Sequence, residues 1–152
     1  MQTNWQWCSF SQLSGHEVYK VLALRQIVFV VGQKCVYLDA DGYDPKCHHL
    51  LGWDSSSPEK ELIAYLRVVP LGLKFAEMSV GRVLTAPSVR GTGLGKKLML
   101  ESFLRIQETF GAQTLRIEAQ YYLEDFYQKL GFKAVSPSYE EDGILHVQML
   151  RP

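Results

Sequence analysis

Apolar residues recur along this chain with two different spacings, and each spacing predicts a different kind of element. Where apolar and polar residues alternate, as in residues 5–10 and 114–120, the pattern predicts half-buried strands. Short apolar runs bounded by turn residues predict further strands. Together the predicted strands are residues 5–10, 49–53, 62–69, 78–84, 114–120, 132–135 and 145–150.

Apolar residues spaced three and four positions apart predict helices between these strands. The first helix follows a capping box in which Ser14 is the N-cap and Glu17 lies three residues later. A second helix covers residues 94–110 and a shorter third one ends at Gly131, since a glycine follows the last apolar position in each. This order predicts one α/β (α+β) domain over residues 1–152, built around a single mixed sheet.

Composition argues against several classes of protein. Of the 152 residues, 47% are apolar or aromatic, which is enough for a full core. The 16 basic and 16 acidic residues give zero formal net charge, which argues against a nucleic-acid partner. No apolar run reaches the ~18 residues of a membrane span, and the first residues lack a signal-peptide pattern. Three cysteines without a C-x-x-C pair argue against a disulfide framework, so we expect a cytoplasmic protein.

The segment from Arg90 to Lys97 carries the strongest chemical signal. Gly91, Gly93 and Gly95 alternate there, with one basic residue before them and two after. Glycines at a strand-to-helix junction let backbone N–H groups converge, and the start of the helix adds unpaired donors and a partial positive charge. The pattern predicts a cradle for a phosphate or pyrophosphate. A tight glycine turn without a ligand is the alternative.

Two common phosphate-binding motifs do not fit this segment. A Walker A loop would need glycine at position 90 and a hydroxyl residue at position 97, where arginine and lysine stand. A dinucleotide fingerprint would need a third glycine at position 96 or 98 and would follow its strand directly. Residues 85–89 intervene here, so neither motif accounts for the glycines.

Two motifs in order resemble the GNAT superfamily of acyl-CoA-dependent N-acetyltransferases. Arg90, Gly93 and Gly95 match its Q/R-x-x-G-x-G/A loop. The sequence Phe-Tyr-Gln-Lys-Leu-Gly-Phe at residues 126–132 matches its second signature, on the same helix–strand–helix segment. The resemblance covers most of the chain. It implies a single-domain GNAT-like α/β (α+β) fold, with a mixed and splayed central sheet of about six to seven strands flanked by about four helices.

Further residues resemble the ElaA-like branch of that superfamily. They are Arg25, Val28, Phe29, Val30, Gln33, the aspartates at 39, 41 and 44, and residues 139–146. Two positions depart from the pattern. Gly32 stands where the branch usually has Glu, and Gln120 stands where many members carry Asn, although its amide can still contact a cofactor.

The resemblance implies an enzyme that transfers acetyl from acetyl-CoA directly to a primary amine of a small molecule or peptide, without a metal. The cofactor-binding residues it implies are Val83, Leu84, Thr85, Arg90, Gly91, Thr92, Gly93, Leu94, Gly95, Lys96 and Gln120. The glycine turn would hold the pyrophosphate, and residues 83–85 would bond to the pantetheine arm as an added strand would. A backbone N–H near Val83 or Leu84 would hold the developing oxyanion.

The resemblance also suggests groups that move protons. Tyr127 matches the family position that protonates the departing thiolate, and a phenol with a pKa near 10 stays protonated at neutral pH. By residue type alone it would be a core aromatic. Glu118 is a candidate base on the polar face of its strand, although a solvated carboxylate is the simpler interpretation. His146 and His49 are further candidates because imidazole titrates near neutral pH, so the sequence supports no single base.

The acidic loop over residues 39–44 leaves several interpretations open. An EF-hand calcium loop fails, because its first and twelfth ligands would be Tyr37 and His48. A zinc site from Cys35 and residues 47–49 is disfavoured, because adjacent strand residues point to opposite faces. The loop would then either attract a cationic amine or serve only as a solvated connection.

A second hypothesis from another class is a non-catalytic acyl-CoA-binding or sensing domain. Gly32 and the lack of a clear base favour it, whereas Tyr127 favours the enzyme. A different nucleotide-binding fold is the third hypothesis. We expect no nucleic-acid or membrane partner, and pairing of exposed strands allows for a homodimer.

Overall fold

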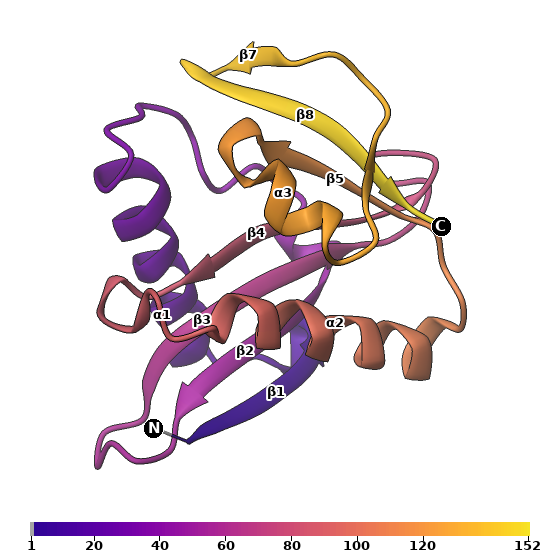
Figure 1. The fold of residues 1–152 in the computed structure, drawn as a ribbon. Coiled ribbons are helices and arrows are strands. Elements are labelled where there is room, and N and C mark those ends of the chain that lie inside the picture. Colours follow the sequence, from indigo (N-terminus) through magenta and orange to yellow (C-terminus); the bar gives the residue numbers. More distant parts are fainter. Residues whose placement is uncertain (1) are drawn as a thin grey trace.

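The computed structural model describes residues 2–152, whose strands form one mixed sheet (Figure 1). The strands are β1 (Thr3–Ser9), β2 (His48–Asp54), β3 (Glu61–Val69), β4 (Met78–Thr85), β5 (Leu115–Gln120), β6 (Lys133–Ala134), β7 (Tyr139–Glu141) and β8 (Ile144–Arg151). The α-helices are α1 (Gly15–Arg25), α2 (Leu94–Phe110) and α3 (Glu124–Gln128). In Figure 1, α1 lies behind the sheet and α2 lies in front of it.

The sheet has one parallel junction, and that junction opens. The strand order is β1-β2-β3-β4-β5-β8-β6, with β7 also paired to β8, and the pairing is antiparallel except between β4 and β5. These two strands are in register only where Met78 faces Leu115 and Ser79 faces Arg116. Beyond that point they diverge, which splays the sheet as expected.

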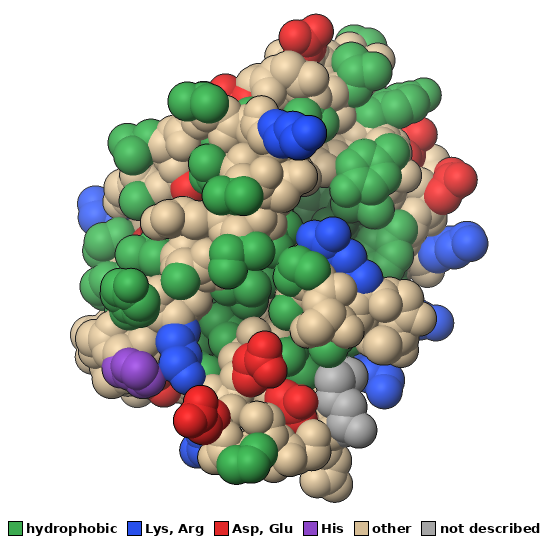
Figure 2. Space-filling view, turned by 90° about the vertical axis from the view of Figure 1, so that its left-hand side faces the viewer, with side chains coloured by type: hydrophobic (Ala, Val, Ile, Leu, Met, Phe, Trp, Pro, Cys, Tyr) green, Lys and Arg blue, Asp and Glu red, His purple; other side chains and the backbone are tan. Residues whose placement is uncertain are grey.

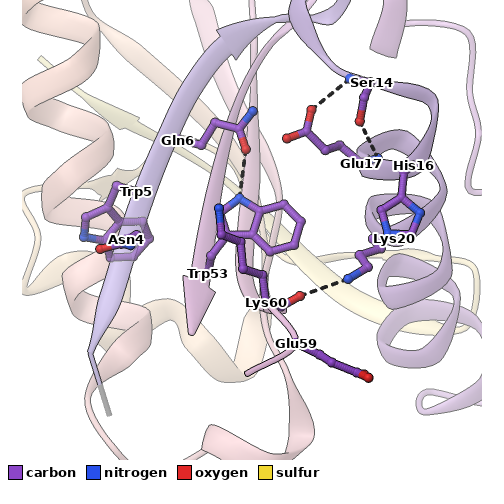
Figure 3. Close-up of a pocket in the computed structure, with 10 residues that line it drawn as sticks. All are labelled: Asn4, Trp5, Gln6, Ser14, His16, Glu17, Lys20, Trp53, Glu59 and Lys60. Atoms are coloured by element: carbon purple, nitrogen blue, oxygen red, sulfur yellow. Dashed lines mark hydrogen bonds between the residues drawn. The ribbon is translucent and has the colours of Figure 1, made fainter. Parts of the chain in front are cut away.

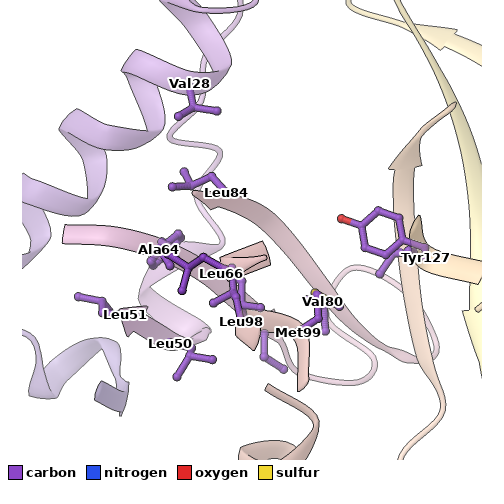
Figure 4. Close-up of a cluster of buried hydrophobic side chains, with 14 of the residues drawn as sticks. Val28, Leu50, Leu51, Ala64, Leu66, Val80, Leu84, Leu98, Met99 and Tyr127 are labelled. Atoms are coloured by element: carbon purple, nitrogen blue, oxygen red, sulfur yellow. The ribbon is translucent and has the colours of Figure 1, made fainter. Parts of the chain in front are cut away.

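The core lies on both faces of the central strands (Figure 4). Residues 62–69 of β3 are all buried, which explains why that strand reads as a nearly continuous apolar run. Leu50 and Leu51 of β2 and Leu98 and Met99 of α2 are also fully enclosed. None of the helices in residues 2–152 combines the length and the apolar character that crossing a bilayer requires.

The first helix begins as predicted, at its capping box, and is followed by a helix of another type. Glu17 N–H donates to Ser14 Oγ at 3.1 Å and Ser14 N–H donates to Glu17 Oε1 at 2.8 Å, so the capping box is confirmed. After Arg25 the chain continues as a π-helix, Gln26–Val31. Gly32 N–H donates to Ile27 O at 2.8 Å, and a Cβ at Gly32 would lie 2.8 Å from that same oxygen. A residue without a Cβ avoids this contact at the closing turn of the π-helix, which explains why glycine occupies position 32.

The predicted α/β class and splayed sheet are confirmed, with differences in detail. The described residues form eight strands and three α-helices, against about six to seven strands and about four helices expected. The additional strand is β7, in the polar segment between the predicted strands 132–135 and 145–150. The turn between β7 and β8 is confined to Asp142 and Gly143, with φ of 52° and 78°, the backbone of a tight hairpin.

Candidate active site

The divergence of β4 and β5 opens a cleft of about 850 Å³. Of the candidate catalytic and cofactor-binding residues, those that line the cleft are Val83, Leu84, Thr85, Arg90, Glu118, Gln120, Tyr127 and His146, whereas residues 91–96 of the glycine turn do not line it. They come from β4, the turn before α2, β5, α3 and β8, so only the fold brings them together. The divergence creates this cleft. If β4 and β5 stayed paired along their whole length, their hydrogen-bonded backbones would occupy the space.

The glycine turn has the conformation of an anion cradle. Gly91 and Gly93 have φ of 80° and 81°, and Gly93 is the N-cap of α2 without a side-chain cap. The first backbone bond of the helix is Lys97 N–H to Gly93 O at 3.3 Å. Within the described chain, the N–H groups of residues 91–96 donate no hydrogen bond. These donors next to Arg90 suit the pyrophosphate of an acyl-CoA.

Strand β4 is irregular where it lines the cleft. Its register with β3 pairs Arg67 with Gly81 and Tyr65 with Leu84, so neither Arg82 nor Val83 has a partner in that register. Arg82 has a φ of 51°, which is uncommon for a residue with a side chain. This bulge lies where residues 80–85 of β4 line the cleft, and bulges are over-represented beside active sites.

Tyr127 is both a core residue and a cleft residue. Its side chain is 6% exposed and packs edge-on against Phe126 and Phe132, with ring centroids 5.1 and 5.8 Å away. Burial raises the pKa of its phenol, so the group is protonated at neutral pH. Its hydroxyl points toward the side of β4 (Figure 4). The two interpretations of this residue from sequence are therefore compatible.

Glu118 is not a free carboxylate, because its Oε1 lies 2.8 Å from Lys74 Nζ. Burial, and then the neighbouring charge of Glu118, raise the pKa of Glu141, which lines the same cleft. His146 also lines it, with Nδ1 2.8 Å from Ile144 O. Several proton acceptors therefore face this end of the cleft.

His49 lies outside the cleft and belongs to the core. Its ring is 1% exposed, with Nδ1 2.6 Å from Tyr65 Oη and Nε2 3.0 Å from Asp44 O. Burial lowers the pKa of His49, which keeps the ring neutral. Both ring nitrogens are engaged, so the structure leaves His49 no proton to exchange with a substrate.

The amide of Gln120 meets another amide across the cleft. Gln33 Nε2 donates to Gln120 Oε1 at 3.1 Å, and Gln120 Nε2 donates to Gln33 Oε1 at 3.2 Å. This reciprocal pair joins β5 to the loop after the π-helix. The cofactor contact expected of Gln120 would require this pair to open.

The aspartates of the acidic loop are bound by arginines, which corrects both interpretations of that loop. Arg25 holds Asp39 and Asp44 at 2.8 and 2.7 Å, and Arg67 holds Asp41 and Asp44 at 2.7 and 2.9 Å. The loop is neither a solvated connection nor a free trap for a cation. The sequence does contain a signal for these ion pairs. Arg25 lies within an apolar helix stripe and Arg67 within an apolar strand, and a buried arginine needs charged partners.

A third arginine, Arg82, joins this cluster from the bulge of β4. Its Nε lies 2.8 Å from Asp39 Oδ1 and its Nη2 lies 3.3 Å from Asp41 Oδ2. The buried cluster therefore connects the acidic loop to the strand that lines the cleft.

The two cysteines of the disfavoured zinc site are engaged with different backbone carbonyls. Cys35 Sγ donates to Asp142 O at 3.1 Å and Cys47 Sγ donates to Tyr43 O at 3.2 Å. Among residues 2–152, no group of three or more His, Cys, Asp or Glu side chains is arranged to hold a metal ion.

A second groove, of about 920 Å³, lies between α1 and strands β1 and β2 (Figure 3). Its polar groups bond to one another: Trp53 Nε1 donates to Gln6 Oε1 at 2.8 Å, and Lys20 Nζ donates to Lys60 O at 2.9 Å. None of the candidate site residues lines it. The cleft between β4 and β5 is therefore the candidate active site.

The face that carries α1 and the following loop exposes many hydrophobic side chains around a hollow (Figure 2). Those from this segment are Tyr19, Ile27, Val31, Val36 and Leu38. Leu38 also lines the cleft, so apolar surface continues from the cleft onto this face.

Comparison with known proteins gives a consistent result. Residues 59–151 match the family model described as an acetyltransferase (GNAT) domain. The chain is 37% identical to the protein ElaA of Escherichia coli over 149 residues, which are 97% of this chain and 95% of that protein. It is 39% identical to a UPF0039 protein of Synechocystis over 150 residues, 99% of this chain and 96% of that protein.

Solved structures agree. An acyl-CoA N-acyltransferase from Pseudomonas aeruginosa is 34% identical and superimposes with a TM-score of 0.92, over 99% of this chain and 100% of that one. The crystal structure of Escherichia coli ElaA is 35% identical with a TM-score of 0.90, again over 99% and 100%.

Proposed function

This chain belongs to the GNAT acetyltransferase family, and we propose that it transfers the acetyl group of acetyl-CoA to a primary amine by direct attack of the amine nitrogen. Membership makes it an acyl-CoA-dependent N-acyltransferase, rather than a non-catalytic sensing domain. The acetyl group, the amine and the direct attack are the proposal. The observation that carries it is a cradle of unengaged N–H groups opening beside a cleft that contains a buried, protonated Tyr127.

The chain would hold acetyl-CoA along one side of this cleft. The N–H groups of residues 91–96 and the guanidinium of Arg90 would bind the pyrophosphate, because both offer donors and positive charge. Residues 83–85 would bind the pantetheine arm, since the bulge frees Val83 from its register with β3. The bound thioester supplies the activated acetyl group.

The reaction divides between the two sides of the splayed sheet. A backbone N–H near Val83 or Leu84 would stabilise negative charge on the thioester oxygen. Tyr127 would give its proton to the departing thiolate. Glu118 would accept the proton of the incoming ammonium directly or through water, once Lys74 releases it. The acceptor amine would enter from the end that carries Glu118 and Glu141.

The wider setting belongs to the same proposal. The acceptor would be a small molecule or a peptide amine, and the neutral net charge supports the absence of a nucleic-acid partner. We further propose that residues 1–152 form a single domain, that the protein is cytoplasmic without a membrane partner, and that pairing of exposed strands allows a homodimer.

Ligand binding tests the cradle first. We expect acetyl-CoA and CoA, but not ATP or NAD, to raise the melting temperature, because a ligand at ~100 times its Kd adds about 2.7 kcal/mol to the free energy of unfolding. A shift with ATP or NAD alone would point to a different nucleotide site, and no shift with any of them would remove the acyl-CoA assignment.

Turnover tests the acid. With a panel of primary amines and detection of released CoA, Tyr127→Phe should lower kcat by about 10²-fold, the usual effect of losing a general acid. Its affinity for acetyl-CoA should stay unchanged, because the ring and its packing remain. An unchanged kcat would mean that Tyr127 is not the proton donor.

A further inference from the structure

One nucleophile of this chain already lies inside the cleft. Of the lysines in the described residues, Lys74 alone lines the cavity that contains Val83 and Tyr127. Its side chain is 27% exposed, and its Nζ lies 2.8 Å from Glu118 Oε1 and 5.6 Å from the centre of the Tyr43 ring. An amine beside a carboxylate, in the cleft of an N-acyltransferase, is the arrangement that an acceptor substrate would have.

We propose that Lys74 is itself an acyl acceptor, so that the protein modifies its own cleft; this rests on the function proposed above. The ammonium of Lys74 loses one proton to Glu118 and from there to water. Its nitrogen then bonds to the acyl carbon as the C–S bond breaks, and the departing sulfur takes a proton from Tyr127. The nitrogen gives up its second proton to solvent, which restores the phenol. The products are an amide at Lys74, free CoA and one released proton.

The reach that this requires lies within one cleft. Lys74, Glu118 and Val83 all line it, and Lys74 Nζ lies 2.8 Å from Glu118 Oε1. Glu118 and Gln120 are two residues apart on β5, which is about 7 Å along the strand. The lysine side chain is flexible and has four carbons, so it can turn from Glu118 toward the thioester position.

The contact that holds Lys74 is weak enough to release it. Lys74 and Glu118 are both partly exposed, at 27% and 22% of their side chains, and an ion pair of this kind contributes ~0–1 kcal/mol. Confinement of the amine near the acyl group favours the transfer, since well-oriented intramolecular reactants reach effective concentrations of about 10⁵ M or more. Acylation leaves a neutral amide, so Glu118 loses its cationic partner.

Mass spectrometry tests the proposal on the purified full chain with acetyl-CoA. We expect one acetyl group at Lys74, added at a rate independent of protein concentration and at least tenfold faster than at Lys133. Lys133 is the internal control, because it is exposed on β6 and lies outside the cleft. Lys74→Arg should keep its thermal shift with acetyl-CoA and lose the rapid acetylation.

A second variant separates transfer catalysed by the cleft from spontaneous chemistry. Tyr127→Phe should slow acetylation of Lys74 by at least tenfold and leave that of Lys133 unchanged. Acetylation of Lys74 no faster than of Lys133 would overturn the proposal, and if an added amine is acetylated in the same sample the proposed function stands. A rate proportional to protein concentration would make the transfer intermolecular and would also overturn it. If acetyl-CoA binds but neither Lys74 nor any added amine is acetylated, the proposed function fails as well.

Discussion

Gly93 and Gly95 lie two residues apart in the same turn, yet their backbones differ. Gly93 has a φ of 81°, which a residue with a Cβ adopts only with strain, although there is open space around the position. Gly95 lies in the first turn of α2 and has no such φ, and a Cβ there would meet only Phe126 Cζ at 3.8 Å. The two glycines of one motif therefore serve different purposes.

Paired alanine variants test this difference. Gly93→Ala should lower the free energy of unfolding by about 1–2 kcal/mol, the penalty of a left-handed residue, and should weaken binding of acetyl-CoA as the cradle shifts. Gly95→Ala is the matched control and should leave the free energy of unfolding unchanged or raise it by up to about 1 kcal/mol, because alanine favours the helix and the new methyl makes an ordinary contact. Equal losses in the two variants, measured by chemical unfolding and thermal shift, would contradict the assignment.

At the scale of elements, the start of α1 is fixed locally and its end is not. The capping box satisfies two N–H groups within four residues of sequence. The π-helix that follows depends on Gly32, whose amide reaches Ile27 O. It carries the chain toward Gln33, which meets Gln120 of a distant strand.

The capping box gives a prediction confined to this element. Ser14→Ala should lower the free energy of unfolding by about 1 kcal/mol, a shift of roughly 2–4 °C in Tm for a chain of this size. Turnover should be unchanged at temperatures where the variant is folded, because Ser14 lies outside the cleft. Glu17→Gln is the control, since glutamine can still accept from Ser14 N–H. A loss of turnover in folded Ser14→Ala would contradict this prediction and would mean that the start of α1 affects the active site.

At the scale of the whole molecule, a buried cluster of charges connects four separate segments. Arg25 of α1, Arg67 of β3 and Arg82 of β4 surround the aspartates at 39, 41 and 44 of one loop. Buried charges are costly unless paired, so the loop, the helix and both strands must take their places together. The cluster also anchors the bulge that borders the cleft.

This cluster predicts sensitivity to acid. Burial opposes ionisation of Asp41 and Asp44, but hydrogen bonds and charge from the arginines outweigh it and lower the pKa of both carboxyls. Because the folded pKa lies below the unfolded value near 4, their contribution to stability is complete above about pH 4 and is lost as the pH falls below it. Urea unfolding between pH 7 and pH 3 should show this decline.

The variant Asp41→Asn isolates the contribution of the cluster from that of other carboxyls. It should be less stable at pH 7, because Arg67 loses a charged partner. Its stability should fall less steeply below pH 4, by up to about 1.4 kcal/mol per pH unit, the effect of one proton. An unchanged acid slope would mean that other groups control acid unfolding.

The sequence by itself determined the features that depend on neighbouring residues. The strand and helix periods, the capping box at Ser14 and the two GNAT signatures were sufficient for the α/β class and the family, which are confirmed. The signatures also predicted functional roles for Tyr127 and the glycine turn, and these roles stay predictions. Periodicity and capping involve residues that are close together in the chain, so both can be recognised without knowing the fold.

Only the tertiary structure decided which distant groups meet. In the folded chain Lys74 lies against Glu118, and His49 lies in the core rather than in the cleft. The acidic loop binds arginines from one helix and two strands. The tertiary structure also created the cleft, because the extent of pairing between β4 and β5 is a property of the whole sheet. Ion pairs and cavities join residues far apart in the chain, and no spacing within one segment encodes their distance.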